Sequence, residues 1–117
     1  MLRMGMMAAL AASLAFTGPA AAQNASQRAA QRQQVLEQFG GAYDGPAAGY
    51  VRRVGDRVAA ALGRRDCAFT VVNSDVVNAF ATPPACDVYV TRGLLSIMNS
   101  EAELAAVLGH EVGHVTA

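Results

Sequence analysis

The sequence predicts an α+β fold in which helices pack with a small antiparallel sheet. Three observations lead to this prediction. Apolar residues recur at every third or fourth position between Pro46 and Leu62, as they do on an amphipathic helix. β-branched and aromatic residues then dominate positions 67–91, which is typical of short strands. Ser100 followed by Glu103 forms a capping box, which predicts that a last helix begins there.

The composition fits one small globular domain. The 117 residues are 53% hydrophobic and 15% charged, which is too apolar for a disordered chain. Nine Arg balance nine acidic residues, there is no Lys, and no stretch gathers the positive charge. A nucleic-acid-binding function is therefore excluded, because it requires a basic surface.

Residues 1–22 have the pattern of a secretory signal peptide. Arg3 precedes an apolar run from Met6 to Phe16, and Ala20-Ala21-Ala22 satisfies the small-residue rule for cleavage before Gln23. The competing interpretation is a retained membrane anchor, although the run is shorter than the roughly 20 residues that span a bilayer. We expect an exported protein in the periplasm or cell envelope, either free or peripherally associated with a membrane.

The predicted elements follow in order along the mature chain. Residues 23–38 are rich in Gln, Ala and Arg and predict a solvated helix, which Gly40-Gly41 interrupts. A second helix begins at Pro46 and ends before Gly63. Strands are predicted at 69–72, 76–81 and 87–91 as an antiparallel meander, a helical segment at 94–98, and the last helix from Ser100. The domain organisation is therefore a signal at 1–22, a helix and linker at 23–45, and a main domain at 46–117.

Cys67 and Cys86 are the two cysteines, 19 positions apart. In an exported protein such a pair tends to form a disulfide, which would stabilise the fold by about 3 kcal/mol. A thiolate metal site is the first alternative, but it usually needs closely spaced cysteine pairs. Two buried free thiols are the second.

The last predicted helix carries both histidines in the pattern His110-Glu111-x-x-His114. Four residues turn a helix by about 400°, so the two imidazoles leave one face about 40° apart and one turn along. Both can reach one ion, and imidazole nitrogens are usual ligands of zinc. Glu111 points about 100° away from His110, where it can approach a water on that ion rather than bind the ion itself.

This arrangement predicts metal-assisted peptide hydrolysis. Zinc lowers the pKa of a bound water towards 7, and Glu111 would act as general base and later pass the proton to the leaving amine. The competing interpretation is that the two histidines only satisfy hydrogen bonds in the core.

Three segments resemble the zinc metallopeptidases grouped with HtpX and the CAAX prenyl endopeptidase, over roughly Pro46 to Ala117. They are Asn78-Ala79-Phe80-Ala81, residues 88–95 and residues 99–114. The chain looks closest to the soluble, exported members of that family. The resemblance implies a gluzincin architecture, here an incomplete zincin-like catalytic domain. It also implies that His110 and His114 are zinc ligands, that Glu111 is the catalytic base, and that Asn78, Ala79 and Phe80 form an edge strand that pairs with the substrate backbone. An ordinary turn role for Asn78 remains open.

Two departures from the family pattern are visible. The family usually has a Pro-Gly-Gly-like turn where this chain has Thr82-Pro83-Pro84-Ala85-Cys86-Asp87, so the local loop differs. The third zinc ligand of the family is a Glu on a later helix, which we expect beyond residue 117. Glu37, Glu101 and Glu103 are poor substitutes, and the 117 residues alone are expected to be inactive.

We therefore expect the front portion of a zinc metalloendopeptidase with one zinc ion per chain. Its partners would be protein or peptide substrates, and the resemblance points to quality control of envelope proteins. A non-catalytic exported binding or scaffold module with incidental metal binding is the alternative. The sequence does not predict a substrate or an oligomeric state.

Overall fold

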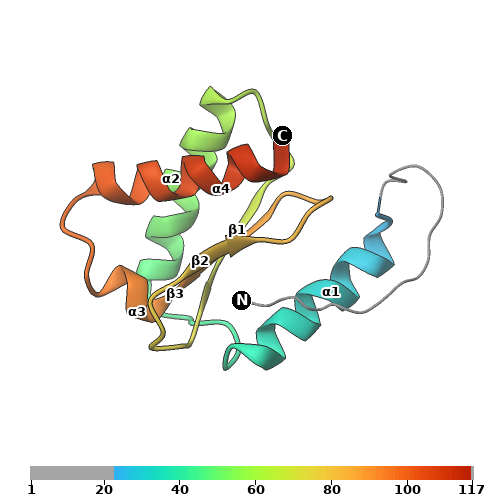
Figure 1. Cartoon of the computed structure of the whole chain (residues 1–117), viewed down its shortest axis with the longest axis horizontal. Helices are drawn as coiled ribbons and strands as arrows, with labels where there is room; N and C mark the ends of the chain where they lie inside the picture. Colours follow the sequence, from blue (N-terminus) through green and yellow to red (C-terminus); the bar gives the residue numbers. More distant parts are fainter. Residues whose placement is uncertain (1–22, 117) are drawn as a thin grey trace.

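The computed structural model describes residues 23–116, which form an α+β domain with a three-stranded mixed sheet. The predicted fold class is confirmed, and the predicted signal at 1–22 lies outside the described residues. Helices α2 and α4 lie on one side of the sheet and α1 on the other (Figure 1). The elements in chain order are α1 (Ala25–Gln38), α2 (Pro46–Ala61), β1 (Ala68–Val72), β2 (Ala79–Ala81), β3 (Asp87–Thr91), α3 (Arg92–Leu95) and α4 (Glu101–Thr116).

Local signals set most helix ends. Asn24 caps α1 by accepting from the Gln27 N–H at 2.7 Å, and the Gln27 side chain accepts from the Asn24 N–H in return. Pro46 begins α2, and Gly63 follows its end with φ +80°, a conformation that glycine adopts without strain. Only Val35 of α1 is buried, which agrees with the predicted solvated helix. No helix in the described part of the chain combines the length and apolar character needed to cross a membrane.

The sheet order corrects the predicted antiparallel meander. The strands lie in the order β1-β3-β2, so β3 is central. The β2–β3 pair is antiparallel as predicted, but β1 and β3 run parallel. After β1, the chain crosses the end of β3 and forms β2 at the opposite edge of the sheet. The second strand also begins at Ala79 rather than at Val76, because Val76 and Val77 lie in the connecting loop and are more than half exposed.

Alternating side chains give the sheet two different faces. Val88 and Val90 of β3 point to the α2 and α4 side and join the main core, in which Val51, Leu108 and Val112 are fully buried. Tyr89, between them, points to the α1 side and packs with Val35, Val72 and the half-buried rings of Phe39 and Phe80. The sheet is therefore the shared layer of two separate apolar clusters.

A buried carboxylate attaches α1 to the sheet. Asp87 is fully buried and accepts two hydrogen bonds of 2.9 Å from Arg28, while Arg32 lies 3.4 Å from the same carboxylate. The hydrogen bond with Asp87 raises the pKa of Arg28, whose guanidinium stays charged. Arg32 also donates to Thr70 of β1 at 3.3 Å. Because a buried charge needs partners, these arginines determine where α1 lies.

Thr91 joins three elements at the end of β3. Its buried hydroxyl accepts from the Leu94 N–H at 3.0 Å, which caps α3, and lies 3.1 Å from both the backbone N–H and the C=O of Asn78. Gly93 donates to the Ser74 carbonyl at 2.9 Å, and a Cβ at this glycine would lie only 2.2 Å from the Asp75 carbonyl oxygen. The cap explains why α3 begins at Arg92, before the predicted 94–98, and the helix then ends at Leu95.

Cys67 and Cys86 form the disulfide that the spacing predicted, and the two alternatives for these cysteines are wrong. The bridge lies directly before β1 and β3, where Ala68 is in register with Asp87. It therefore joins the first residues of the two parallel strands.

Candidate active site on helix α4

Helix α4 presents the three candidate side chains and is fixed at both ends. The Ser100 hydroxyl accepts from the Glu103 N–H at 3.2 Å, but the Glu103 carboxylate accepts from Asn99 instead of Ser100, which corrects the predicted reciprocal capping box. Glu101 binds Tyr50 at 3.0 Å and Arg57 at 2.8 Å, both from α2. At the other end Arg64 donates to Thr116 at 3.1 Å. The helix is therefore anchored along α2.

The helical repeat divides α4 between core and site. Leu104, Leu108 and Val112 are buried at spacings of four and face the sheet and α2. Glu111 lies beside Val112 on the same side and is only 8% exposed. His110 and His114 lie at the margin of this face and are both exposed. The interpretation that these histidines serve the core is therefore wrong.

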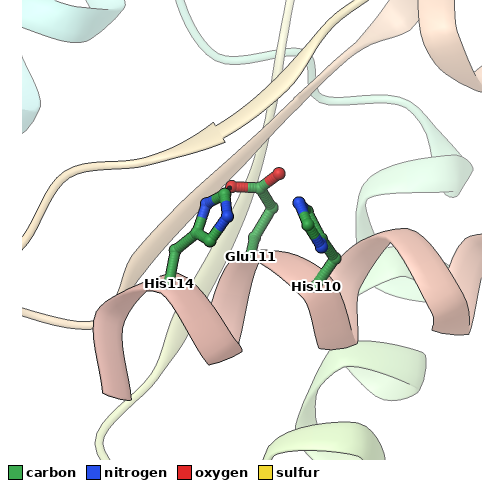
Figure 2. A group of neighbouring side chains, drawn as sticks. All are labelled: His110, Glu111 and His114. Atoms are coloured by element: carbon green, nitrogen blue, oxygen red, sulfur yellow. Dashed lines mark ion pairs between the residues drawn. The ribbon is translucent and has the colours of Figure 1, made fainter. Parts of the chain in front are cut away.

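The three side chains converge on one point. Figure 2 shows the Glu111 carboxylate between the two imidazole rings, with all three on the same side of the helix. Their candidate ligand atoms all lie within 4.8 Å of one another. The ring centroids of His110 and His114 are 4.3 Å apart, and Nδ1 of His114 lies 3.6 Å from Oε1 of Glu111. No other metal-ligating group of three is found among residues 23–116.

This donor set fits a zinc ion. Two nitrogens that share one zinc at about 2.0–2.1 Å lie no more than about 4.2 Å apart, which is close to the 4.8 Å within which the three candidate ligand atoms lie. Apart from the Glu111 contact, neither imidazole has a hydrogen-bond partner in the described residues that would compete for it. Glu101 and Glu103 are occupied at the start of α4 and lie outside the group, in agreement with the sequence analysis.

The open edge of the sheet lies next to α4, which packs against β2. β2 is an edge strand, as predicted for Ala79 and Phe80, while Asn78 comes directly before it. The opposite edge, at β1, is partly covered, because Ala42 forms a bridge with Val72. Among residues 23–116, no strand pairs with the outer side of β2.

The register shows which backbone groups β2 presents outward. The Thr91 N–H donates to the Asn78 carbonyl at 3.0 Å, and the Thr82 N–H donates to the Asp87 carbonyl at 3.1 Å. Hydrogen-bonded and non-hydrogen-bonded pairs alternate along an antiparallel ladder. Asn78, Phe80 and Thr82 therefore direct their backbone groups toward β3. The N–H and C=O groups of Ala79 and Ala81 point to the open edge.

Residues 46–117 match peptidase family M48. The chain belongs to this family. The match confirms the resemblance to the metallopeptidases grouped with HtpX, and M48 is a family of zinc metallopeptidases. It covers the site helix and the whole sheet, whereas α1 lies outside it.

Curated relatives share a short, well-matched segment with the chain. The chain is 53% identical over 47 residues to the mitochondrial metalloendopeptidase OMA1 of Arabidopsis thaliana. The aligned segment covers 40% of this chain and 10% of that protein. The chain is 50% identical over 48 residues to a protease HtpX homolog of Streptococcus agalactiae. The aligned segment covers 38% of this chain and 16% of the relative. A protease HtpX homolog of Streptococcus pneumoniae matches to the same extent. The matched segments thus make up a minor part of each relative.

The contacts that hold α1 against the sheet are not predicted by the sequence. Asp87 begins a predicted strand, and the sequence predicts no role for Phe39. The spacing of Arg28 and Arg32, one helical turn apart on an otherwise uncharged stretch, was the available signal. Their common partner is 55–59 residues away in the chain, so only the folded structure identifies it.

Proposed function

We propose that this M48 member is a zinc metalloendopeptidase that hydrolyses peptide bonds in exported proteins. The observation that carries the proposal is the convergence of His110, Glu111 and His114 beside an open strand edge. The family match and the relatives named as proteases support it.

In this proposal His110 and His114 hold the zinc ion through their imidazole nitrogens. When bound, zinc supplies Lewis acidity, which acidifies a water and polarises a substrate carbonyl. A catalytic zinc site commonly uses three protein ligands. We propose that the third is a carboxylate from outside residues 23–116, as the family resemblance implies.

Glu111 is the proposed general base. Its carboxylate is nearly buried yet lies beside both imidazoles, so it is shielded from bulk water while it faces the reaction. It accepts a proton from the attacking water and then delivers that proton to the nitrogen of the departing amine. Proton transfer by a positioned side chain contributes about 10²–10⁴-fold to a rate.

The substrate backbone is proposed to pair with β2 by strand addition. Ala79 and Ala81 offer the outward N–H and C=O groups for this pairing. Asn78 uses its own backbone groups on Thr91, so its contribution would come through its exposed side chain. Phe80 would contribute its ring.

We also propose that the protein is exported and acts in envelope protein quality control. The Cys67–Cys86 disulfide supports export, because disulfides persist in oxidising compartments. Fractionation of cells followed by detection of the protein tests this location, and recovery in the cytosol with reduced cysteines would contradict it.

Glu111→Gln tests the mechanism. In the complete gene product, we expect the variant to lose peptide cleavage by about 10²–10⁴-fold and to retain bound zinc, measured by mass spectrometry of the metal content. Glu103→Gln is the matched control, because it makes the same change on the exposed face of α4. Unchanged cleavage in Glu111→Gln would exclude the base assignment and favour a non-catalytic binding module.

A further inference from the structure

A stack of three aromatic rings lies on the α1 side of the sheet, opposite to helix α4. The rings of Phe80 on β2 and Tyr89 on β3 are stacked with centroids 5.1 Å apart. Phe39, at the end of α1, lies over Phe80 with centroids 4.8 Å apart. Tyr89 is fully buried, whereas Phe39 and Phe80 both remain partly exposed.

The exposed part of this stack is next to the open strand edge. Phe80 is the middle residue of β2, between the two residues whose backbone groups point outward. A peptide strand added to Ala79 and Ala81 would place one residue directly opposite Phe80. Cβ atoms of directly opposite residues on neighbouring strands are about 4.5–5.5 Å apart, which is contact distance for an aromatic ring.

We propose that Phe39 and Phe80 form a subsite for an apolar or aromatic side chain of the extended peptide substrate. This inference rests on the proposed function, because it assumes that the substrate pairs with β2. Side chains of an added strand alternate between the two faces. Those on one face meet the histidines on α4, and those on the other meet the two phenylalanines. The substrate class is therefore an extended segment with an apolar residue on the face away from α4.

Phe39 places one wall of this subsite in the N-terminal region of the chain. Phe39 lies outside the family match at 46–117, and α1 is held in position by the pairing of Arg28 and Arg32 with Asp87. The Phe39 N–H bonds to the carbonyls of Val35 and Leu36, so its backbone belongs to the end of the helix. The attachment of α1 thus supports one wall of the subsite.

The test measures side-chain preference in peptide binding. A fixed octapeptide host receives Phe, Leu or Ser at each position in turn, and its affinity for the zinc-loaded Glu111→Gln protein is measured by calorimetry. We expect Phe to bind about 2- to 10-fold more tightly than Ser at positions two residues apart, the size of an aromatic pair interaction. At intervening positions the preference should be absent.

Variants at Phe39 assign the preference to the subsite. Phe39→Ala should reduce the Phe-to-Ser affinity ratio to about one, and Phe39→Leu, which keeps an apolar side chain and protects folding, should lower it. Phe39→Tyr should retain it. Leu36→Ala is the matched control, because Leu36 packs in the same cluster without belonging to the ring stack. It should leave the ratio unchanged.

Three results would overturn the subsite: equal affinities for Phe and Ser at every position, no binding of any peptide, or a preference that survives in Phe39→Ala. Cleavage by the wild-type protein without dependence on Phe would retain the peptidase and exclude the subsite. A Phe preference without any cleavage would retain the subsite and exclude the peptidase. These results therefore distinguish failure of the subsite from failure of the proposed function.

Discussion

The two faces of the sheet are held by different physical forces. On the α4 side, mainly aliphatic side chains of α2, the sheet and α4 pack together with the ring of Phe69, and this core carries the His-Glu-His group. On the α1 side, a buried Asp87 with two arginines and a stack of aromatic rings attach a mostly exposed helix. Apolar burial has no fixed direction, whereas ion pairs and ring stacks require particular geometry.

This difference separates the part of the chain that the family match covers from the helix that precedes it. The α4 side lies within the family match, and the helix on the other side precedes it. The core on the α4 side holds the His-Glu-His group in place, whereas the α1 side reaches the edge strand through the contact between Phe39 and Phe80. The two faces should therefore respond differently to mutation.

Leu108→Ala should have the largest effect on stability. Leu108 is fully buried on α4 between the sheet and α2, and removal of such a side chain costs about 2–5 kcal/mol. Urea unfolding should show this loss for the whole domain. Val107→Ala, next to it and only partly buried, is the control and should cost less. Equal losses for both would contradict a core centred on Leu108.

Removal of the disulfide tests the layer that both faces share. The double variant Cys67→Ser/Cys86→Ser opens a loop with a sequence separation of 19 and should cost about 3 kcal/mol. The loss should appear as a lower urea midpoint, and a reductant should then have no further effect on the variant. A wild-type protein insensitive to the reductant would show that the bridge contributes little.

Asp87→Asn should act mainly on the α1 side. The amide keeps the volume of the carboxylate but weakens its charged hydrogen bonds to Arg28 and Arg32, which contribute about 1.5–3 kcal/mol. Hydrogen exchange should show faster exchange in α1 and little change in α4. Glu37→Gln makes the same kind of change on the exposed surface of α1 and should alter neither. Equal loss of protection in both helices would show that the faces unfold together.

Tyr89→Phe should have the smallest effect and the opposite sign. The Tyr89 hydroxyl is buried with Thr82 and Arg32 as polar neighbours but forms no hydrogen bond of good geometry among the described residues, and burial is the main cause that raises its pKa. Loss of an unsatisfied hydroxyl should stabilise the domain by about 1 kcal/mol in thermal unfolding. Tyr50→Phe is the contrast, because its hydroxyl bonds Glu101 and its loss should not stabilise. Destabilisation by Tyr89→Phe would show that its hydroxyl has a partner.

The features that could be predicted from the sequence are those encoded over short distances. The group on α4 follows from the helical repeat of four residues, and α2 from its apolar spacing and flanking Pro46 and Gly63. The disulfide followed from the cysteine spacing and the expected compartment. Each of these depends on residues that are near one another in the chain or on a single pair.

The parallel pairing of β1 with β3 was not predictable in this way. Three short strands within 24 residues favour a meander, yet the loop after β1 is held across the end of β3 by Thr91 and Gly93. The attachment of α1 also depends on Asp87, more than 50 residues distant from its partners. Such pairings are decided by packing of the whole domain and leave little trace in local patterns.

The tripeptide Thr91-Arg92-Gly93 has a consequence for directed evolution. The Thr91 hydroxyl donates to the Asn78 carbonyl, and Arg92 donates to Asn73 at 2.9 Å. Because Gly93 has no Cβ, the backbone of Asp75 can lie against it. These contacts hold the loop that leads into the edge strand. The neighbouring Val76 and Val77 are more than half exposed, and neither belongs to a hydrophobic cluster of the described residues. A library that retains the tripeptide and randomises these two valines would therefore vary the exposed surface beside the edge strand without loosening the loop that leads into it.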